Sequence, residues 1–516
     1  MRAVSRAAFR AQDNTRAPRE PAAASKPSAY THATTLKPMV DFVPPLPFAL
    51  PPELPFTRQA LDAADALFPY SQEHSLEQVT RLRAQGFTPD ETANILSLVK
   101  ARTRAMSKFS DRARTMFLTE HGAQQATRPV VAAEHAAVFA RAGIRSVADL
   151  GCGIGADSLE FARASLGTVS VELDPLTASF AAANLADFSG SRVVVGDVTN
   201  FDPESFRDGT GEAVQGIWLD PARRDLTGVV KSRTERIFDP EAYSPPLSFV
   251  VDLARTGMPV GVKLGPGMPH EAIVRPEDIR SEANPHPRVT AQWVEHEGSL
   301  VELVLWFNAL AQEGVARTVT VLRQEAEDEG LHIHKTTLSS PHSAEQVTPV
   351  EQEQTRLPSP GEYLYEPSGA VVRAHLVQEL AQELGANLVD PHLAYLTAAE
   401  AVQSPLAQCY EVLEEIPVHE KQLKKWVRER GFTALTIKKR GVDLVPEKMR
   451  AILLAGGTGK KSGKKAAKNQ GYNPATLVFT RVGSGQQARR IGWHVRPVDF
   501  SDAAHVSSAD TKSSLV

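Results

Sequence analysis

The stretch VADLGCGIG, Val147 to Gly155, decides the fold of this chain of 516 residues. A short apolar run ends in Asp149, and glycines follow at alternate positions, Gly151, Gly153 and Gly155. Glycine is favoured where the backbone must turn sharply or approach a ligand closely. Because a helical pattern follows the glycines, the stretch predicts a buried strand, a tight turn and a helix whose first N–H groups are free to bind a ligand.

Further acidic residues end strand-like runs downstream: Glu172 in VSVELDP, Asp197 in VVVGDV and Asp220 in IWLDPARRD. These runs alternate with helical stretches, which predicts an α/β fold with a mostly parallel sheet covered on both faces. Open sheets of this kind bind ligands at the carboxyl ends of their strands. There Glu172 can accept hydrogen bonds from both hydroxyls of a ribose, and Asp197 can meet an adenine amine.

The runs DLGCGIG, VELDP, GD and DPAR, in this order, resemble the motifs of class I, Rossmann-like methyltransferases. The resemblance implies S-adenosylmethionine as the cofactor, with the glycine loop beside its methionine part. It also implies that Glu172 holds the ribose and that Asp197 contacts adenine, with Val198 beside the ring. Asp174 could replace Glu172 in one of these roles. A nicotinamide oxidoreductase, which uses the related G-x-G-x-x-G loop, is a distant alternative.

The run DPAR stands where amine methyltransferases carry Asp, Asn or Ser followed by Pro-Pro and an aromatic residue. In those enzymes the polar side chain and a prolyl carbonyl hold the target amine, which implies such roles for Asp220 and Pro221. Ala222 replaces the second proline and Arg223 replaces the aromatic residue. N-methylation is therefore a hypothesis, and the alternative is that Asp220 only closes the cofactor pocket.

Arg223 and the cations that follow it, together with Lys263 in KLGPG, could form a positive rim around the substrate mouth, suited to phosphates. Ordinary surface ion pairing explains the same residues. The chain has two cysteines: Cys152 lies inside the glycine loop, and Cys409 lies far away in the C-terminal part. Pyrimidine C5 methylation through a cysteine adduct is therefore not expected. Two cysteines also exclude a disulfide framework and a Cys-rich zinc site, and they fit the cytoplasm.

The segment from Lys108 to Ala136 is similar to the N-terminal segment of RNA guanine-N2 methyltransferases, including the cap trimethylguanosine synthases. In those enzymes the segment covers the methionine end of the cofactor. The resemblance gives this role to Gln125, Thr127 and Arg128. Helix packing alone is the simpler explanation of much of the segment.

Residues 421–468 contain 15 Lys or Arg against 3 Asp or Glu, although the whole chain carries a net charge of −4. A basic module on an acidic protein suggests a polyanion such as RNA as partner, although a charge run can also be only a solubilising face. YLYEPSGAVVRAHL, LVDPHLAYLT and LTIKKRGVDL resemble the THUMP-like domain of a bacterial methyltransferase family. RNA binding does not follow automatically from this resemblance.

The expected fold class is α/β with an N-terminal helical segment and a C-terminal α+β domain. The expected parts are a Pro-rich, disordered tail (1–56), a helical segment (57–142), a methyltransferase domain (143–324), a linker (325–360), a THUMP-like domain (361–497) and a second disordered tail (498–516). No apolar run is long enough for a signal peptide or a membrane span, although the basic tail also has features of a transit peptide.

The leading hypothesis is an S-adenosylmethionine-dependent methyltransferase that modifies a base nitrogen of tRNA or rRNA, with no metal and no membrane partner. The first alternative is a small-molecule methyltransferase whose basic region is incidental. The second is an RNA-binding protein that keeps the cofactor fold but has lost catalysis, which the departures at Ala222 and Arg223 keep open.

Overall fold

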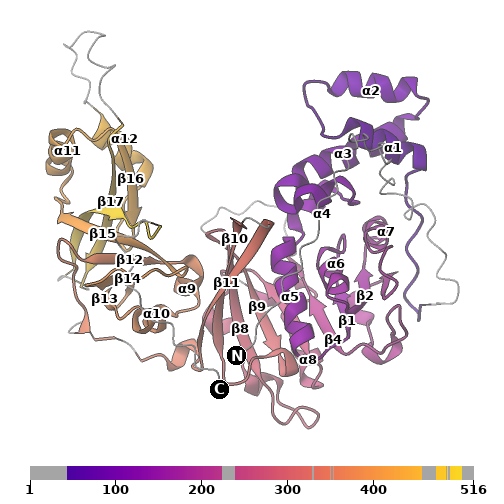
Figure 1. Ribbon diagram of the computed structural model, residues 1–516. Helices are drawn as coiled ribbons and strands as arrows, with labels where there is room; N and C mark the ends of the chain where they lie inside the picture. The colour runs from indigo at the N-terminus through magenta and orange to yellow at the C-terminus, as the bar shows by residue number, and fades with distance from the viewer. Residues whose placement is uncertain are drawn as a thin grey trace, which may run out of the picture.

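The structure, a computed structural model, describes residues 44–223, 239–327, 330–348, 350–351, 354–455, 472–483, 485 and 488–501. An N-terminal helical part and a C-terminal seven-stranded sheet stand on either side of a nine-stranded sheet (Figure 1). The predicted tails 1–56 and 498–516 and the basic stretches 224–238 and 456–471 lie wholly or mostly outside the described residues.

The N-terminal part is helical, as the sequence predicted. Its helices are α1 (Arg58–Leu67), α2 (Ser75–Ala84), α3 (Pro89–Phe109), α4 (Glu120–Gln125) and α5 (Pro129–Arg141). At the start of helix α3, the Thr88 side chain accepts the backbone N–H of Glu91, and the Glu91 carboxylate accepts the N–H of Thr88. This capping box satisfies N–H groups that the first helical turn leaves unpaired.

The nine-stranded sheet contains the predicted α/β core. Its strands are β1 (Ser146–Leu150), β2 (Gly167–Glu172), β3 (Ser191–Val195), β4 (Gly216–Leu219), β7 (Val260–Leu264), β8 (Val289–His296), β9 (Ser299–Phe307), β10 (Arg317–Glu327) and β11 (Gly330–Ser340), in the order β11-β10-β8-β9-β7-β4-β1-β2-β3. The five neighbouring strands β7, β4, β1, β2 and β3 are parallel. Strand β9 runs antiparallel between β7 and β8. All five parallel strands therefore end at the same edge of the sheet.

Helices cover both faces of this sheet. On one face, α5 and α6 (Ala156–Arg163) bury Phe139 and Phe161 against Trp218 and Trp306 of the strands. Helix α7 (Pro175–Asn184) packs beside α6. On the other face α8 (Leu247–Arg255) covers the parallel strands. A small ribbon of β5 (Ala222–Arg223) and β6 (Tyr243–Ser244) follows the end of β4.

The predicted linker 325–360 differs from the structure in its first half. Strands β10 and β11 pair antiparallel from Arg317 to Ser340, and β10 also pairs parallel with β8. The hairpin therefore forms the edge of the nine-stranded sheet. The sequence did not indicate this hairpin, because much of β11 is exposed to solvent and its polar sequence lacks an alternating apolar pattern.

The C-terminal sheet has the order β13-β14-β12-β15-β18-β17-β16. Its strands are β12 (Tyr363–Pro367), β13 (Asn387–Asp390), β14 (Leu393–Ala398), β15 (Ala407–Glu415), β16 (Ala434–Lys439), β17 (Pro474–Val482) and β18 (Arg489–Pro497), with helices α9 (Gly369–Arg373), α10 (Val377–Glu383), α11 (Glu420–Glu429) and α12 (Pro446–Leu454). Helices α11 and α12 pack on β16 and β17.

The two sheets share a core. Helix α9 buries Ala370 and Val371 in the same cluster as Trp293 of β8 and Val319 of β10. The guanidinium of Arg317 donates to the carbonyls of Ala374, at 2.6 Å, and His375, at 2.8 Å. The start of the C-terminal part is therefore packed against the nine-stranded sheet.

Candidate active site

The glycine loop lies at the carboxyl edge of β1, as the sequence predicted. Gly151, Gly153 and Gly155 have φ values of +85°, +57° and +78°, a left-handed region that side chains rarely adopt. A Cβ atom at Gly153 would meet no protein atom within 4 Å, and one at Gly151 would come no closer than 3.8 Å to the Asp220 carbonyl. The loop therefore borders open space, which a bound cofactor can fill.

Glu172 and Asp174 have different surroundings at the end of β2. The Glu172 carboxylate accepts the N–H of Gly153 at 3.0 Å and the N–H of Asp174 at 2.9 Å, so it is tied to the glycine loop. The Asp174 carboxylate caps α7, where it accepts the N–H and the hydroxyl of Thr177. Of the two acids, Glu172 has the position suited to a ribose beside the loop.

Asp197 and Val198 follow β3 at the same edge. The Asp197 carboxylate accepts the N–H and the hydroxyl of Thr199, at 2.9 and 2.8 Å, and this bond fixes the turn that begins at Val198. Val198 is partly buried against the core of the sheet. A fixed carboxylate beside a partly buried apolar side chain fits an adenine amine and its ring.

Asp149 is buried beneath the loop rather than exposed to a ligand. Its carboxyl group accepts the Ser158 hydroxyl, which also contacts the Ser170 hydroxyl at 2.8 Å. Burial, followed by the negative charge of Asp157, raises the pKa of Asp149 to about 8. A buried Asp149 with a raised pKa, bonded to Ser158, fits a role in holding β1, β2 and α6 together beneath the loop.

Asp220 is joined to Lys263 across the ends of β4 and β7. The Lys263 ammonium donates to Asp220 Oδ2 and, at 3.1 Å, to the hydroxyl of Thr127 from the N-terminal part. Burial raises the pKa of Asp220, and the adjacent Lys263 charge opposes this shift. The side chain of Asp220 is still 32% exposed, so it can reach a ligand. Pro221 is buried beside it.

The structure thus brings together Asp220, Lys263 and Thr127, which come from three separate segments. The strand of Arg223 pairs with that of Tyr243, but the Arg223 side chain and the basic residues from 224 to 238 lie outside the described residues. The predicted positive rim is therefore represented here by Lys263 alone. Gln125 ends α4 and Arg128 is the N-cap residue of α5, so Thr127 lies in the turn between these two helices.

A buried chain of charged groups, which the sequence did not reveal, extends from Thr127 into the core. The Thr127 hydroxyl donates to Asp157 Oδ2 at 2.7 Å, and Asp157 Oδ1 contacts His135 Nδ1 at 2.8 Å. His135 Nε2 contacts Glu302 Oε1 at 2.6 Å. Burial lowers the pKa of His135, but Glu302 and Asp157 outweigh burial and raise the pKa to about 10.

Lys108 adds a second amine near this site. Its ammonium donates to the backbone carbonyls of Ala123, Gln124 and Ala126 at the end of α4. Burial, and then the nearby charges of Arg128 and Lys263, lower the pKa of Lys108 to about 8. This contact holds α3 against the turn that carries Thr127.

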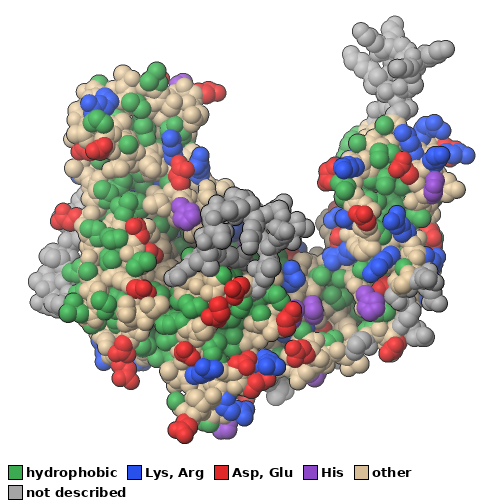
Figure 2. All heavy atoms as spheres, turned by 180° about the vertical axis from the view of Figure 1, so that it is seen from behind, with side chains coloured by type: hydrophobic (Ala, Val, Ile, Leu, Met, Phe, Trp, Pro, Cys, Tyr) green, Lys and Arg blue, Asp and Glu red, His purple; other side chains and the backbone are tan. Residues whose placement is uncertain are grey.

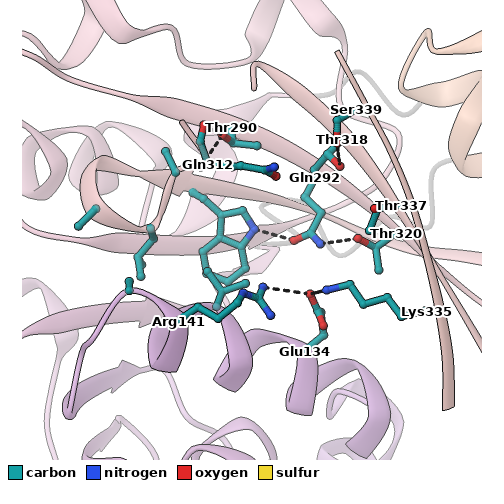
Figure 3. A pocket seen from close by; sticks show the side chains of 16 residues that line it. Glu134, Arg141, Thr290, Gln292, Gln312, Thr318, Thr320, Lys335, Thr337 and Ser339 are labelled. Atoms are coloured by element: carbon teal, nitrogen blue, oxygen red, sulfur yellow. Dashed lines mark hydrogen bonds and ion pairs between the residues drawn. The ribbon is translucent and has the colours of Figure 1, made fainter. Parts of the chain in front are cut away.

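Two cavities lie away from the glycine loop. One, of about 260 Å³, lies between α5 and the strands β8, β10 and β11, where Lys335 and Arg141 both reach Glu134 (Figure 3). The other, of about 410 Å³, lies between the end of α3 and helices α6 and α7. Neither of these two cavities is lined by the predicted cofactor residues.

The predicted basic region is only partly a free surface. Lys438 pairs with Glu366 at 3.1 Å, and Arg440 donates to the Pro367 carbonyl and lies over the Tyr395 ring. These two cations hold β16 to β12 and β14. Cations also gather on the outside of the C-terminal part (Figure 2). On α11, the cations Lys421, Lys424, Lys425 and Arg428 lie opposite its buried Leu423, Trp426 and Val427.

Comparisons with known proteins agree with this architecture. Residues 407–497 match the family described as THUMP domain-like. Two Mycobacterium tuberculosis proteins, from strains CDC 1551 / Oshkosh and ATCC 25618 / H37Rv, are 27% identical over 379 residues, 73% of this chain and 88% of theirs. Both are named uncharacterized S-adenosylmethionine-dependent methyltransferases. A solved structure from Porphyromonas gingivalis W83, described as a candidate methyltransferase, is 16% identical with a TM-score of 0.57, and the match covers 86% of this chain and all of that one.

The glycine loop, the sheet and these matches define the class of protein. The chain is a class I, S-adenosylmethionine-dependent methyltransferase with a THUMP-like domain in its C-terminal part. The described residues contain no group of three or more His, Cys, Asp or Glu side chains placed to hold a metal ion. No helix in the described part of the chain is both long and apolar enough to cross a membrane.

Proposed function

We propose that this methyltransferase transfers the methyl group of S-adenosylmethionine to a base nitrogen of RNA, in tRNA or rRNA. The observation that carries the proposal is the position of Asp220. Its backbone carbonyl borders the glycine loop, and its carboxylate Oδ2 is held by Lys263. The other oxygen, Oδ1, remains for an N–H of the acceptor.

The residues at the sheet edge would divide the binding of the cofactor among them. The glycine loop would border the methionine part, Glu172 would accept the ribose hydroxyls, and Asp197 with Val198 would hold adenine. Each carboxylate oxygen has two lone pairs, so the backbone bonds of Glu172 leave capacity for a ligand. Bound S-adenosylmethionine supplies a methyl group on a sulfonium, which is a good leaving group.

The chemistry then depends mainly on positioning the acceptor. Asp220 Oδ1 would accept one N–H of the amine, and the Pro221 carbonyl would accept a second, as in the amine methyltransferases that DPAR resembles. These bonds direct the nitrogen lone pair toward the methyl group. Lys263 holds the Asp220 carboxylate in place and stabilises its negative charge.

The proposal of RNA as substrate rests on the THUMP-like match and on the cations of α11. A row of lysines and arginines that is free of the core can follow a phosphate backbone. Lys438 and Arg440 are committed to contacts inside the domain, so α11 replaces them as the proposed contact surface. Lys439, which is exposed, remains part of it.

Nucleoside mass spectrometry of tRNA and rRNA from a strain lacking the protein tests the proposal. A single methylated nucleoside should disappear, and purified protein with S-adenosylmethionine should restore it in vitro. If every methylated nucleoside remains in the RNA of that strain and the protein methylates a small amine, the assignment moves to a small-molecule methyltransferase. RNA binding without any methyl transfer would favour the non-catalytic alternative, which the departures at Ala222 and Arg223 suggest.

A further inference from the structure

The buried chain that ends at Asp220 has a fixed order of charges. From the core outward it is formed by Glu302, His135, Asp157, Thr127 and Lys263. The signs alternate, and the neutral Thr127 hydroxyl joins an acid to a base. Side-chain exposure is 3% at Glu302, 0% at His135 and 8% at Asp157, and it rises to 17% at Lys263 and 32% at Asp220.

The hydrogen bonds of this chain can be assigned a donor and an acceptor at each step. Lys263 can only donate, so the Thr127 oxygen accepts from it and the Thr127 hydroxyl donates to Asp157. Both nitrogens of His135 face carboxyl oxygens, at 2.8 and 2.6 Å, so both donate when the two acids are ionised. His135 is therefore an imidazolium, and its charge balances two buried acids.

The chain also connects elements that are far apart in the sequence. His135 is on α5, Asp157 on α6, Glu302 on β9 and Lys263 on β7. The centroids of the His135 and Trp218 rings lie 4.2 Å apart. Trp218 is on β4, two residues before Asp220. His135 thus contacts both the chain and the strand that lead to Asp220.

Stability alone does not explain such a chain. Taking charges out of water is costly, and well-packed apolar residues often replace a buried ion pair without loss of stability. A chain of charges instead fixes one geometry, because each group has a single arrangement that satisfies its neighbours. Its exposed end is the carboxylate that faces the acceptor.

We propose that the chain Glu302–His135–Asp157–Thr127–Lys263 is a positioning device for Asp220, with Thr127 as its critical link. The inference rests on the proposed function of Asp220 as the group that orients the acceptor nitrogen. Thr127 acts through Lys263 and is a positioning residue. Its hydroxyl is the only group among the described residues that links Lys263 to Asp157 by hydrogen bonds.

The substitution Thr127→Val tests the link because it removes the hydroxyl and keeps the shape of the side chain. It should lower kcat about 10-fold, since small displacements of a positioning group have effects of up to about 100-fold. The KM for RNA and the Kd for S-adenosylhomocysteine should stay within about twofold of the wild type, because the positioning acts in the transition state. Thr127→Ser should restore most of the lost rate.

The substitution Thr168→Val is the matched control. Thr168 is fully buried on β2 of the same sheet, and its hydroxyl has no hydrogen-bond partner among the described residues. This variant should keep the wild-type kcat. The assays use total RNA from cells lacking the protein as the methyl acceptor, and calorimetry with S-adenosylhomocysteine.

A second measurement does not depend on the substrate. Nitrogen NMR of protein labelled with [¹⁵N]histidine should show His135 doubly protonated at pH 8, with and without S-adenosylhomocysteine. A neutral His135 would overturn the inference. So would a Thr127→Val kcat equal to that of Thr168→Val, or a Thr127→Val loss confined to cofactor affinity. Absence of methyl transfer to RNA by the wild type would instead contradict the proposed function, and the His135 signal would still decide on the charged chain.

Discussion

The carboxyl edge of the nine-stranded sheet and the α11 surface of the THUMP-like domain use the same residue types in opposite ways. At the sheet edge, charged groups are buried and bonded to one another, from Glu302 to Lys263. On α11, Lys421, Lys425 and Arg428 are exposed to solvent. The first arrangement fixes positions and the second presents charge.

The physical cause of the difference is the medium. A buried pair interacts strongly and at one geometry, because little water is present to screen it. Exposed charges act through a screened, long-range field that depends on salt and carries no fixed geometry. A site for chemistry therefore needs the first arrangement, and a surface for an RNA backbone needs the second.

The largest effect is expected from His135→Gln, which leaves Asp157 and Glu302 buried without their shared cation. Breaking a buried pair on one side costs about 3–5 kcal/mol. The pKa of His135 is raised to about 10, from about 6.5 in the unfolded chain, so protonation stabilises the fold fully below about pH 6.5. That contribution is lost as the pH rises through 10.

Denaturant unfolding of wild type and His135→Gln between pH 6.5 and 10 measures this effect. The difference in unfolding free energy should narrow as the pH rises. A difference that is independent of pH would show that His135 stabilises the fold by packing against Trp218 and not by its charge.

The next largest effect is expected from Asp220→Ala. Without the carboxylate the acceptor nitrogen is not oriented, and methyl transfer should fall about 100-fold, about 2.7 kcal/mol at the transition state. Calorimetry should show nearly unchanged affinity for S-adenosylhomocysteine. Equal losses of binding and of turnover would support the alternative in which Asp220 only closes the cofactor pocket.

A smaller effect is expected on the exposed side of the comparison. Changing Lys421, Lys424 and Arg428 together to Gln, a good helix former, should weaken RNA binding about 10-fold. The slope of log affinity against log salt should flatten by about 2, since each phosphate contact contributes about 0.7–0.9. Lys438→Gln is the control: Lys438 pairs with Glu366 inside the domain, so its replacement should leave the affinity for RNA unchanged. An unchanged slope in the triple variant would exclude α11 as the contact surface.

The smallest effect separates Glu172 from Asp174. Asp174→Ala removes the cap of α7 and should cost about 1 kcal/mol of stability, with little change in cofactor affinity. Glu172→Gln should instead lower cofactor affinity, measured by calorimetry, with little change in stability, measured by thermal melting. If instead Asp174→Ala abolishes cofactor binding while Glu172→Gln does not, the ribose role belongs to Asp174.

The sequence located the glycine loop and the acids at the strand ends because the signals that mark them are local. Glycines 151, 153 and 155 and the acids at the ends of β2, β3 and β4 are each recognised within a few residues of a strand. The sequence did not reveal the buried chain of charged groups, because its members are far apart in the sequence. His135 and Glu302 are 167 residues apart, and an isolated histidine on a helix has no distinctive pattern.

Charge counting was similarly incomplete in the C-terminal part. It identified a basic region between 421 and 468, but it could not separate Lys438 and Arg440, which bond within the domain, from the exposed row on α11. The distinction depends on Glu366 and Pro367, which stand on β12 in a different part of the chain. Sequence spacing carries no information about such pairings across a sheet.

The sequence by itself determined the α/β class and the glycine loop and acids at its strand ends, because periodicity and turn chemistry are properties of short segments. Its resemblance to a known family indicated the THUMP-like part. Only the tertiary structure decided that Asp220 is held by Lys263, that Thr127 connects it to a buried imidazolium, and that the hairpin of β10 and β11 extends the sheet. These features arise where distant segments meet, and burial there decides which charges pair and which remain exposed to solvent.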